Sequence, residues 1–157
     1  MQKAKNTIQI ALVIIVAGLL LFLLFNKNKL NEFISAEMQK QATPADSLSV
    51  AQLITTKYNY LKNELDYEFT LLEFGSTGCT ACKQMEPVLE EFRQLEKPKV
   101  KVVFLNIMQP ENLPQMKHFG ISAIPMQIVL DREGKEIYRH YGFISSADLL
   151  RKFVPEV

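Results

Sequence analysis

The sequence lacks the features that would mark a repetitive, disordered or nucleic-acid-binding chain. Its 157 residues contain no internal repeat and no tract of strongly biased composition, which argues against a solenoid or a wholly disordered protein. The formal net charge is only +1, so there is no electrostatic reason to expect nucleic acid as a partner. The chain has no tryptophan and only two cysteines. Its length suits one compact domain with an appendage.

One apolar run stands apart from this balanced composition. Residues 8–25 (IQIALVIIVAGLLLFLLF) are interrupted only by Gln9, and a run of about 18 apolar residues is near the minimum that spans a bilayer. A cleaved signal peptide is the alternative, but its apolar stretch is shorter and ends in small residues, whereas this run leads into NKNKL. No lipidation cysteine lies nearby. We predict a short head over residues 1–7 and a retained transmembrane anchor over residues 8–25.

The charges beside this run do not decide its orientation. Lys3, Lys5 and the amino terminus on one side nearly balance Lys27 and Lys29 on the other. A short polar head before a signal-like run is typical of an export anchor, so we expect the N-terminus inside. The protein is then a single-pass membrane protein whose domain is extracytoplasmic, in the periplasm or on the outer face.

The rest of the chain predicts an α/β domain. Residues 26–47 are read as a juxtamembrane stalk or linker in which ATPADS breaks the structure, and residues 48–157 as the domain. The expected elements are a helix from a Ser49 cap to about Glu64, a strand over 69–75, a helix over 80–95, a strand over 101–107, a short helix over 110–119, a hairpin of 126–130 and 136–141, and a helix over 145–153. This order implies a central mixed sheet flanked by helices.

The two cysteines carry the clearest chemical signal. Cys79 and Cys82 follow a predicted buried strand and stand at the start of a predicted helix. Backbone N–H groups at a helix N-terminus stabilise a thiolate, so Cys79 is the expected nucleophile toward a disulfide. Cys82, one turn further in, would then attack the mixed disulfide and release the reduced substrate. No cofactor is expected beyond this redox-active pair.

The segment EFGSTGCTACKQMEPVLEEF resembles the active-site strand, CxxC motif and helix of thioredoxins. Pro87 matches the proline within that family's active-site helix, and FGISAIPMQIVLDREGKEIYRHYGF resembles the hairpin with the family's cis-proline. The resemblance covers residues 49–154. It implies a thioredoxin fold, preceded here by one transmembrane helix.

The resemblance also implies where a substrate binds. Pro125 should follow Ile124 through a cis peptide bond, which is a minority state even before proline. The backbone near Ile124 would then lie beside the CxxC and pair with an extended substrate segment. Thr80 and Ala81, between the two cysteines, are the other expected substrate contacts.

Glu73 interrupts an otherwise apolar predicted strand, six residues before Cys79. It matches the position where thioredoxins carry a buried acid, usually aspartate. Burial raises the pKa of a carboxyl group, and near the cysteines such a group can accept and return the proton of Cys82. An exposed edge-strand glutamate is the alternative.

The sequence departs from thioredoxins at several active-site positions. Gly75 and Gly78 stand where the family has aromatic residues, and Thr-Ala replaces the usual Gly-Pro between the cysteines. The lysine often found on the neighbouring strand is Phe104 here. Loss of that cation should raise the pKa of Glu73 further.

We therefore predict a membrane-tethered thiol-disulfide oxidoreductase, acting as a reductase on extracytoplasmic proteins with thiols or disulfides. Its electrons would come from a membrane electron-transfer partner. A disulfide-forming oxidase is the nearest alternative, and a metallochaperone or non-catalytic module is the other. The metal alternative would join the cysteines to His118 and His140, but both histidines are more simply surface residues, and no metal is expected.

Overall fold

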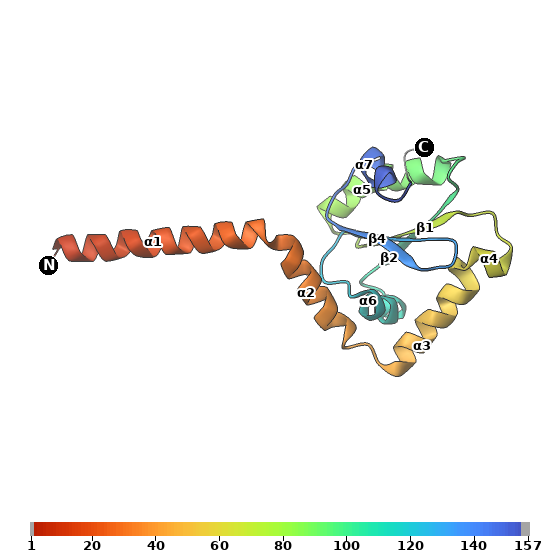
Figure 1. The fold of residues 1–157 in the computed structure, drawn as a ribbon, viewed down its shortest axis with the longest axis horizontal. Helices are drawn as coiled ribbons and strands as arrows, with labels where there is room; N and C mark the ends of the chain where they lie inside the picture. The colour runs from red at the N-terminus through yellow and green to blue at the C-terminus, as the bar shows by residue number, and fades with distance from the viewer. Residues whose placement is uncertain (1, 155–157) are drawn as a thin grey trace.

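A long N-terminal helix projects from a compact α/β domain in the computed structural model (Figure 1). The structure describes residues 2–154, without the side chains of residues 2–8, 11 and 28. Met1, the start of the predicted head, and residues 155–157, the end of the predicted domain, lie outside the described residues.

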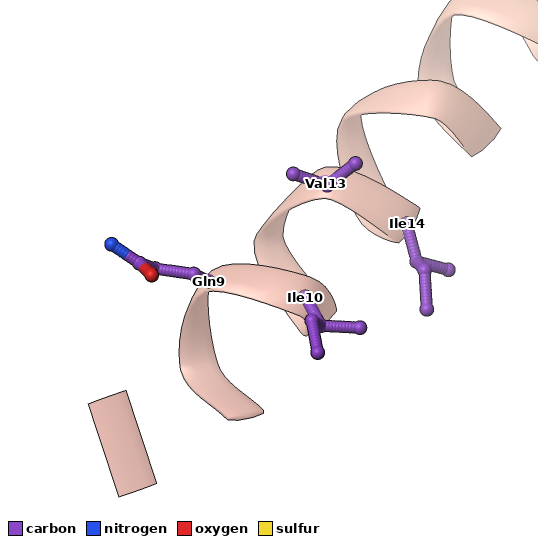
Figure 2. A pocket seen from close by; sticks show the side chains of 4 residues that line it. All are labelled: Gln9, Ile10, Val13 and Ile14. Atoms are coloured by element: carbon purple, nitrogen blue, oxygen red, sulfur yellow. The ribbon is translucent and has the colours of Figure 1, made fainter. Parts of the chain in front are cut away.

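Helix α1 (Gln2–Phe25) covers the predicted anchor, and its described large apolar side chains from Ile10 to Phe25 are exposed. Figure 2 shows Ile10, Val13 and Ile14 projecting from this helix. No single helix, among the residues searched, is long and apolar enough to cross a membrane. The segments Leu12–Phe25 and Lys29–Gln39, which meet at a bend of 67°, satisfy the length and composition requirements together. The anchor over residues 8–25 stays a prediction.

The sheet has four strands in the order β2-β1-β3-β4. Strand β1 (Phe69–Gly75) pairs in parallel with β2 (Val100–Asn106) and antiparallel with β3 (Met126–Leu130), and β3 pairs antiparallel with β4 (Glu136–Tyr141). The parallel pair needs the crossover helix between its strands, and the tight hairpin needs only a turn. The predicted mixed sheet is confirmed, with β1 at its centre between β2 and β3.

Helices cover both faces of this sheet. The helical elements that follow α1 are α2 (Lys27–Gln39), α3 (Pro44–Leu53), a π-helical turn (Ile54–Tyr58), α4 (Tyr60–Asn63), α5 (Thr80–Gln94), a 3-10 turn (Pro110–Asn112), α6 (Leu113–Phe119) and α7 (Ser146–Phe153). Leu71 packs with residues of α5 and α7, whereas Leu72 packs with residues of α3 and α6. Alternate side chains of β1 therefore serve two separate apolar cores, as the period of a strand requires.

The start of α3 differs from the prediction. Ser49 lies inside this helix, and the N-cap is Thr43, whose hydroxyl accepts the N–H of Asp46 at 3.1 Å. The Asp46 carboxylate in turn accepts the N–H of Thr43 at 3.0 Å, and Pro44 occupies the first turn. This capping box stabilises the helix start, so the predicted break lies before Pro44, between α2 and α3, and the rest of ATPADS already belongs to α3.

Helix α2 lies within the predicted stalk and packs on the domain. Its Ser35 is 3 % exposed, and the Ser35 hydroxyl donates to the carbonyl oxygen of Gly120 at 2.6 Å. Arg139 on β4 donates to the Ser35 hydroxyl at 2.9 Å and to the Phe119 carbonyl at 3.2 Å. Since Gly120 and Phe119 end α6, these bonds join α2 to both α6 and the sheet.

Candidate active site

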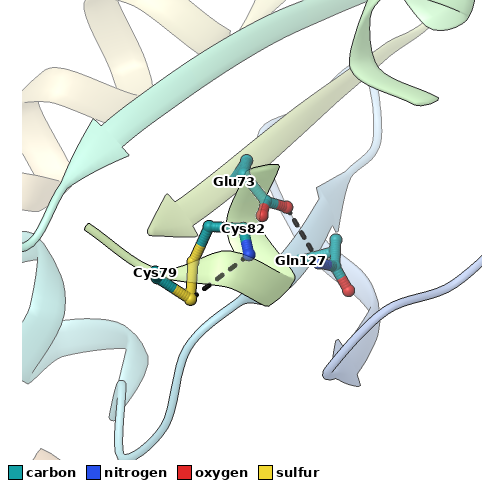
Figure 3. The surroundings of a disulfide bond; sticks show 4 residues. All are labelled: Glu73, Cys79, Cys82 and Gln127. Atoms are coloured by element: carbon teal, nitrogen blue, oxygen red, sulfur yellow. Dashed lines mark hydrogen bonds between the residues drawn. A yellow bond between two sulfur atoms is a disulfide. The ribbon is translucent and has the colours of Figure 1, made fainter. Parts of the chain in front are cut away.

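The two cysteines form a disulfide at the point where β1 gives way to α5 (Figure 3). Cys79 is the N-cap of α5 and Cys82 lies in its first turn, with their Cα atoms 5.2 Å apart. The loop after Gly75 is short, so the C-terminal end of the central strand delivers Cys79 directly to the helix N-terminus. The structure brings the predicted redox pair together.

The two sulfur atoms have different surroundings. Cys79 is partly exposed, whereas Cys82 is 4 % exposed. The backbone N–H of Cys82 donates to Cys79 Sγ at 3.2 Å. A Cys79 thiolate would keep this charge-assisted bond and the positive end of the helix dipole, both of which lower the pKa of a thiol. The geometry therefore makes Cys79 the accessible nucleophile and Cys82 the shielded partner.

Glu73 is fully buried on β1 and lies beside the disulfide (Figure 3). Burial raises its pKa from 4.5 to about 8, although a hydrogen bond from Gln127 Nε2 to Glu73 Oε2 at 2.9 Å favours the charged form. An ordinary thiol has a pKa of about 8.5, so a proton can pass between Glu73 and a thiol at little free-energy cost. The exposed edge-strand alternative for Glu73 is wrong, because β1 is a central strand covered on both faces.

Gln127 is the residue that the sequence reasoning missed. It stands opposite Glu73 in the β1–β3 pairing and is also fully buried. The signal was present, because Gln127 interrupts the apolar strand MQIVL just as Glu73 interrupts FTLLEFG. Glu73 Oε1 and Gln127 Oε1 have no hydrogen-bond partner within residues 9–154. An unpaired buried carboxyl oxygen disfavours the carboxylate and agrees with a neutral Glu73.

Gly75 and Phe104 fit together beside Cys82. A Cβ atom on Gly75 would lie 2.9 Å from Phe104 Cε2 and 3.3 Å from Cys82 Sγ, which leaves no room for a side chain at this position. Phe104 is the β2 partner of Glu73, so its ring borders the same face of the sheet as the buried acid. The ring thus occupies the space beside Cys82 that an aromatic residue at position 75 would need.

The cis-proline loop is where the sequence predicts it. The Ile124–Pro125 peptide bond is cis, Pro125 is buried and Ile124 is partly exposed. The Pro125 carbonyl oxygen accepts the N–H of Gly142 at 2.8 Å, which fixes the loop to the end of β4. Strand β3 begins at Met126, opposite Phe74, so the loop lies at the same end of the sheet as the cysteines. A second cis bond, Lys97–Pro98, was not predicted.

The remaining predicted site residues have clear positions. Thr80 is exposed and Ala81 is partly exposed in the first turn of α5, which leaves both open to a substrate. Their role in binding stays a prediction. His118 packs edge-on against Phe119, and His140 Nε2 lies 3.2 Å from the Phe143 carbonyl oxygen. Within the residues that the structure describes, no three His, Cys, Asp or Glu side chains lie together in a group that could hold a metal ion.

Comparisons with known proteins identify the family of the domain. The sequence model of the thioredoxin-like domain matches residues 60–154. A thioredoxin from Rickettsia felis is 32% identical over 96 residues, which are 60% of this chain and 89% of that protein. The Arabidopsis thaliana protein named thioredoxin-like protein HCF164, chloroplastic, is 34% identical over 67 residues, 43% of this chain but only 26% of that protein. The chain thus spans about a quarter of the length of this relative.

The fold is also similar to a solved thioredoxin. The crystal structure of thioredoxin NaTrxh from Nicotiana alata superposes with a TM-score of 0.51 at 25% identity, over 68% of this chain and 84% of that one. A Synechocystis protein named thiol:disulfide interchange protein TxlA homolog is 32% identical over 46% of this chain and 41% of its own length. The chain belongs to the thioredoxin-like family of thiol-disulfide oxidoreductases.

Proposed function

We propose that this chain is a membrane-tethered reductase that breaks disulfides in extracytoplasmic proteins. The observation that carries the proposal is the unequal exposure of the two sulfurs at the start of α5, above a buried acid. A pair built in this way can form a mixed disulfide through one sulfur only and resolve it through the other.

The first step uses the reduced protein. The Cys79 thiolate attacks one sulfur of a substrate disulfide, which forms a Cys79–substrate bond, breaks the substrate S–S bond and releases one substrate thiolate. The cis-proline loop, with Ile124 partly exposed beside it, offers backbone along which an extended substrate segment can lie. Thr80 and Ala81 would contact the substrate from the other side of Cys79.

The second step returns the protein to its disulfide form. Cys82 loses its proton to the carboxylate form of Glu73, and the resulting thiolate attacks Cys79 Sγ and releases the second substrate thiolate. Two electrons pass from the cysteine pair to the substrate, and the released thiolates take up protons from water. When a donor reduces the Cys79–Cys82 disulfide, Glu73 can give the proton back to Cys82.

The tether supports an extracytoplasmic reductase supplied from the membrane. Residues 8–25 are apolar except for Gln9, and α1 extends away from the domain (Figure 1). A reductase outside the cytoplasm needs a source of electrons, and a membrane electron-transfer partner can meet a tethered domain without diffusion through the compartment. Substrates are proteins with accessible disulfides.

Trapping of substrate tests the cysteine roles. In the full chain, Cys82→Ser should accumulate a mixed disulfide with disulfide-bonded insulin or with another disulfide protein, because the resolving thiol is missing. Cys79→Ser is the matched control and should trap nothing. Equal trapping by both variants would show that the order of the two cysteines is wrong, and no trapping by either would remove the enzymatic proposal.

The reduction potential of the Cys79–Cys82 pair decides the direction of electron flow. A reductase should have a potential below about −230 mV, near or below the thioredoxin range. A value near −120 mV, as in strong disulfide-forming oxidases, would instead assign the opposite reaction to the same residues. Equilibration of the full chain with glutathione and with dithiothreitol redox buffers gives this value directly.

A further inference from the structure

We propose that α2 is a surface helix that lies on the bilayer, with Leu30, Phe33 and Ile34 inserted at the lipid surface, and that it holds the domain at a fixed position above the membrane. This inference rests on the proposed anchoring through residues 8–25 and adds a second, separate contact with the lipid.

One side of α2 packs against the domain. Gly120 has a φ of +65°, and a Cβ atom there would lie 2.4 Å from the Ser35 carbonyl oxygen and 2.5 Å from the Ser35 hydroxyl. The backbones of α2 and the α6 end are therefore in direct contact, which only glycine allows. Near the start of α2, the Tyr141 hydroxyl reaches the Asn31 carbonyl oxygen at 3.5 Å.

Arg139 makes the contact between α2 and the domain rigid. Its guanidinium bonds to Ser35 and Phe119 on one side and forms an ion pair with Glu136 on the other, where Nη2 lies 2.7 Å from Oε2. Both partners of the pair are about a quarter exposed. A charge held by several hydrogen bonds cannot turn away without leaving buried groups unpaired, so α2 is fixed to β4.

The other side of α2 is apolar and uncovered. Leu30, Phe33 and Ile34 are 45%, 68% and 43% exposed, and their i, i+3, i+4 spacing places them on one face of the helix. Such a face on a helix that is otherwise polar is typical of a helix lying in a membrane interface. Lys27 and Lys29, both exposed at the start of α2, suit anionic lipid headgroups.

The geometry of the α1–α2 junction favours lipid over a protein as the occupant. Only Asn26 separates α2 from the apolar α1, and the polar residues 26–29 lie between that run and the apolar stripe formed by Leu30, Phe33 and Ile34. The bend of 67° means that an α1 running across the bilayer sets α2 closer to the membrane plane than to its normal. In Figure 1, α2 runs between the end of α1 and the domain.

A single tryptophan tests this placement, because the natural chain has none. Phe33→Trp in the full chain, reconstituted in vesicles of phosphatidylethanolamine and phosphatidylglycerol, should emit at shorter wavelength than in detergent-free buffer controls. Its emission should fall when the vesicles contain lipids brominated near the headgroup. Leu61→Trp is the matched control: Leu61 is 54% exposed on α4, on the far side of the domain, and a tryptophan there should not be quenched.

Leu20→Trp on α1 separates this inference from the proposed anchor. Quenching of Leu20→Trp by deeply brominated lipids together with quenching of Phe33→Trp by shallow ones supports both. Quenching of Leu20→Trp alone overturns the surface-helix inference and leaves the anchor. Absence of quenching at both positions overturns both. In a further outcome, Phe33→Trp is not quenched by brominated lipid, but its protection from iodide quenching increases with protein concentration. A second copy of the chain would then cover the stripe, and the inference would be overturned.

Discussion

At the scale of single residues, Glu73 determines how protons move through the site. We expect Glu73→Gln to slow disulfide exchange by about a hundredfold, because a positioned general acid or base contributes about that factor or more. The loss should fall mainly on the step in which Cys82 attacks the mixed disulfide. Stopped-flow measurement of that step, starting from a preformed Cys79 mixed disulfide, checks this expectation, and an unchanged rate would contradict it.

The raised pKa of Glu73 also makes stability depend on pH. The unfolded chain releases the Glu73 proton near pH 4.5, whereas the folded protein holds it until about pH 8. Between these values the native state binds one more proton, so the free energy of unfolding should fall by about 1.4 kcal/mol for each unit of rising pH from this group alone. Urea unfolding across pH 5 to 8 of the wild type against Glu73→Gln isolates this slope, which the variant should lack.

Phe104 offers a test of why the pKa of Glu73 is so high. Phe104→Lys would place an ammonium group on the strand next to the buried acid, and a nearby opposite charge lowers the pKa of a carboxyl group. The free energy of unfolding should therefore stop falling with rising pH at a pH that is lower by about one unit or more. Phe104→Leu, which keeps the position apolar, is the control and should move it much less. A shift of the same size in both variants would assign the effect to packing and not to charge.

At the scale of elements, the packing of α2 against the domain depends on Gly120. Gly120→Ala combines a left-handed backbone conformation with a clash against Ser35, so it should cost about 1–3 kcal/mol of stability. The lost contact should also increase hydrogen exchange of α2 amides. Gly142→Ala is the matched control, since Gly142 also has positive φ but has no atom within 4 Å of an added Cβ. Equal exchange of α2 in the two variants would show that the close contact is unimportant.

The strands were more predictable than the helix ends. The hairpin strands β3 and β4 begin and end at the residues predicted from the sequence, 126–130 and 136–141. The start of α3 was mispredicted because Ser49 and Thr43 both suit an N-cap, and only the reciprocal bond with Asp46 distinguishes them. Local patterns fix the type of an element well, but a cap is decided by a short-range hydrogen bond that composition does not reveal.

The residues of the active site also differ in how well the sequence predicts them. Cys79, Cys82 and the cis Pro125 follow from motif and resemblance, because their spacing along the chain is itself the signal. Gln127 and the fit of Phe104 against Gly75 depend on which residues face each other across strands, and that register exists only in the folded sheet.

At the scale of the whole molecule, the contact between α2 and β4 changes what a tether does. A flexible stalk would let the redox site reach in any direction within its length. A helix fixed by Ser35 and Arg139 instead gives the domain one orientation relative to α2. In Figure 1 the start of α5 lies on the side of the domain from which α1 leaves. With residues 8–25 anchored as proposed above, a partner that meets the start of α5 on this side would itself lie in or on the membrane.

The buried Glu73 has one more consequence, for the chain as an electron carrier. The pKa of about 8 belongs to the oxidised protein, in which the cysteines carry no charge. Reduction introduces thiols beside the acid, and any thiolate charge there makes ionisation of Glu73 harder still. The reduced protein then holds that proton more tightly, so acid favours reduction by more than the thiol protons alone require. The chain should therefore be a weaker reductant in an acidic compartment and a stronger one in an alkaline compartment.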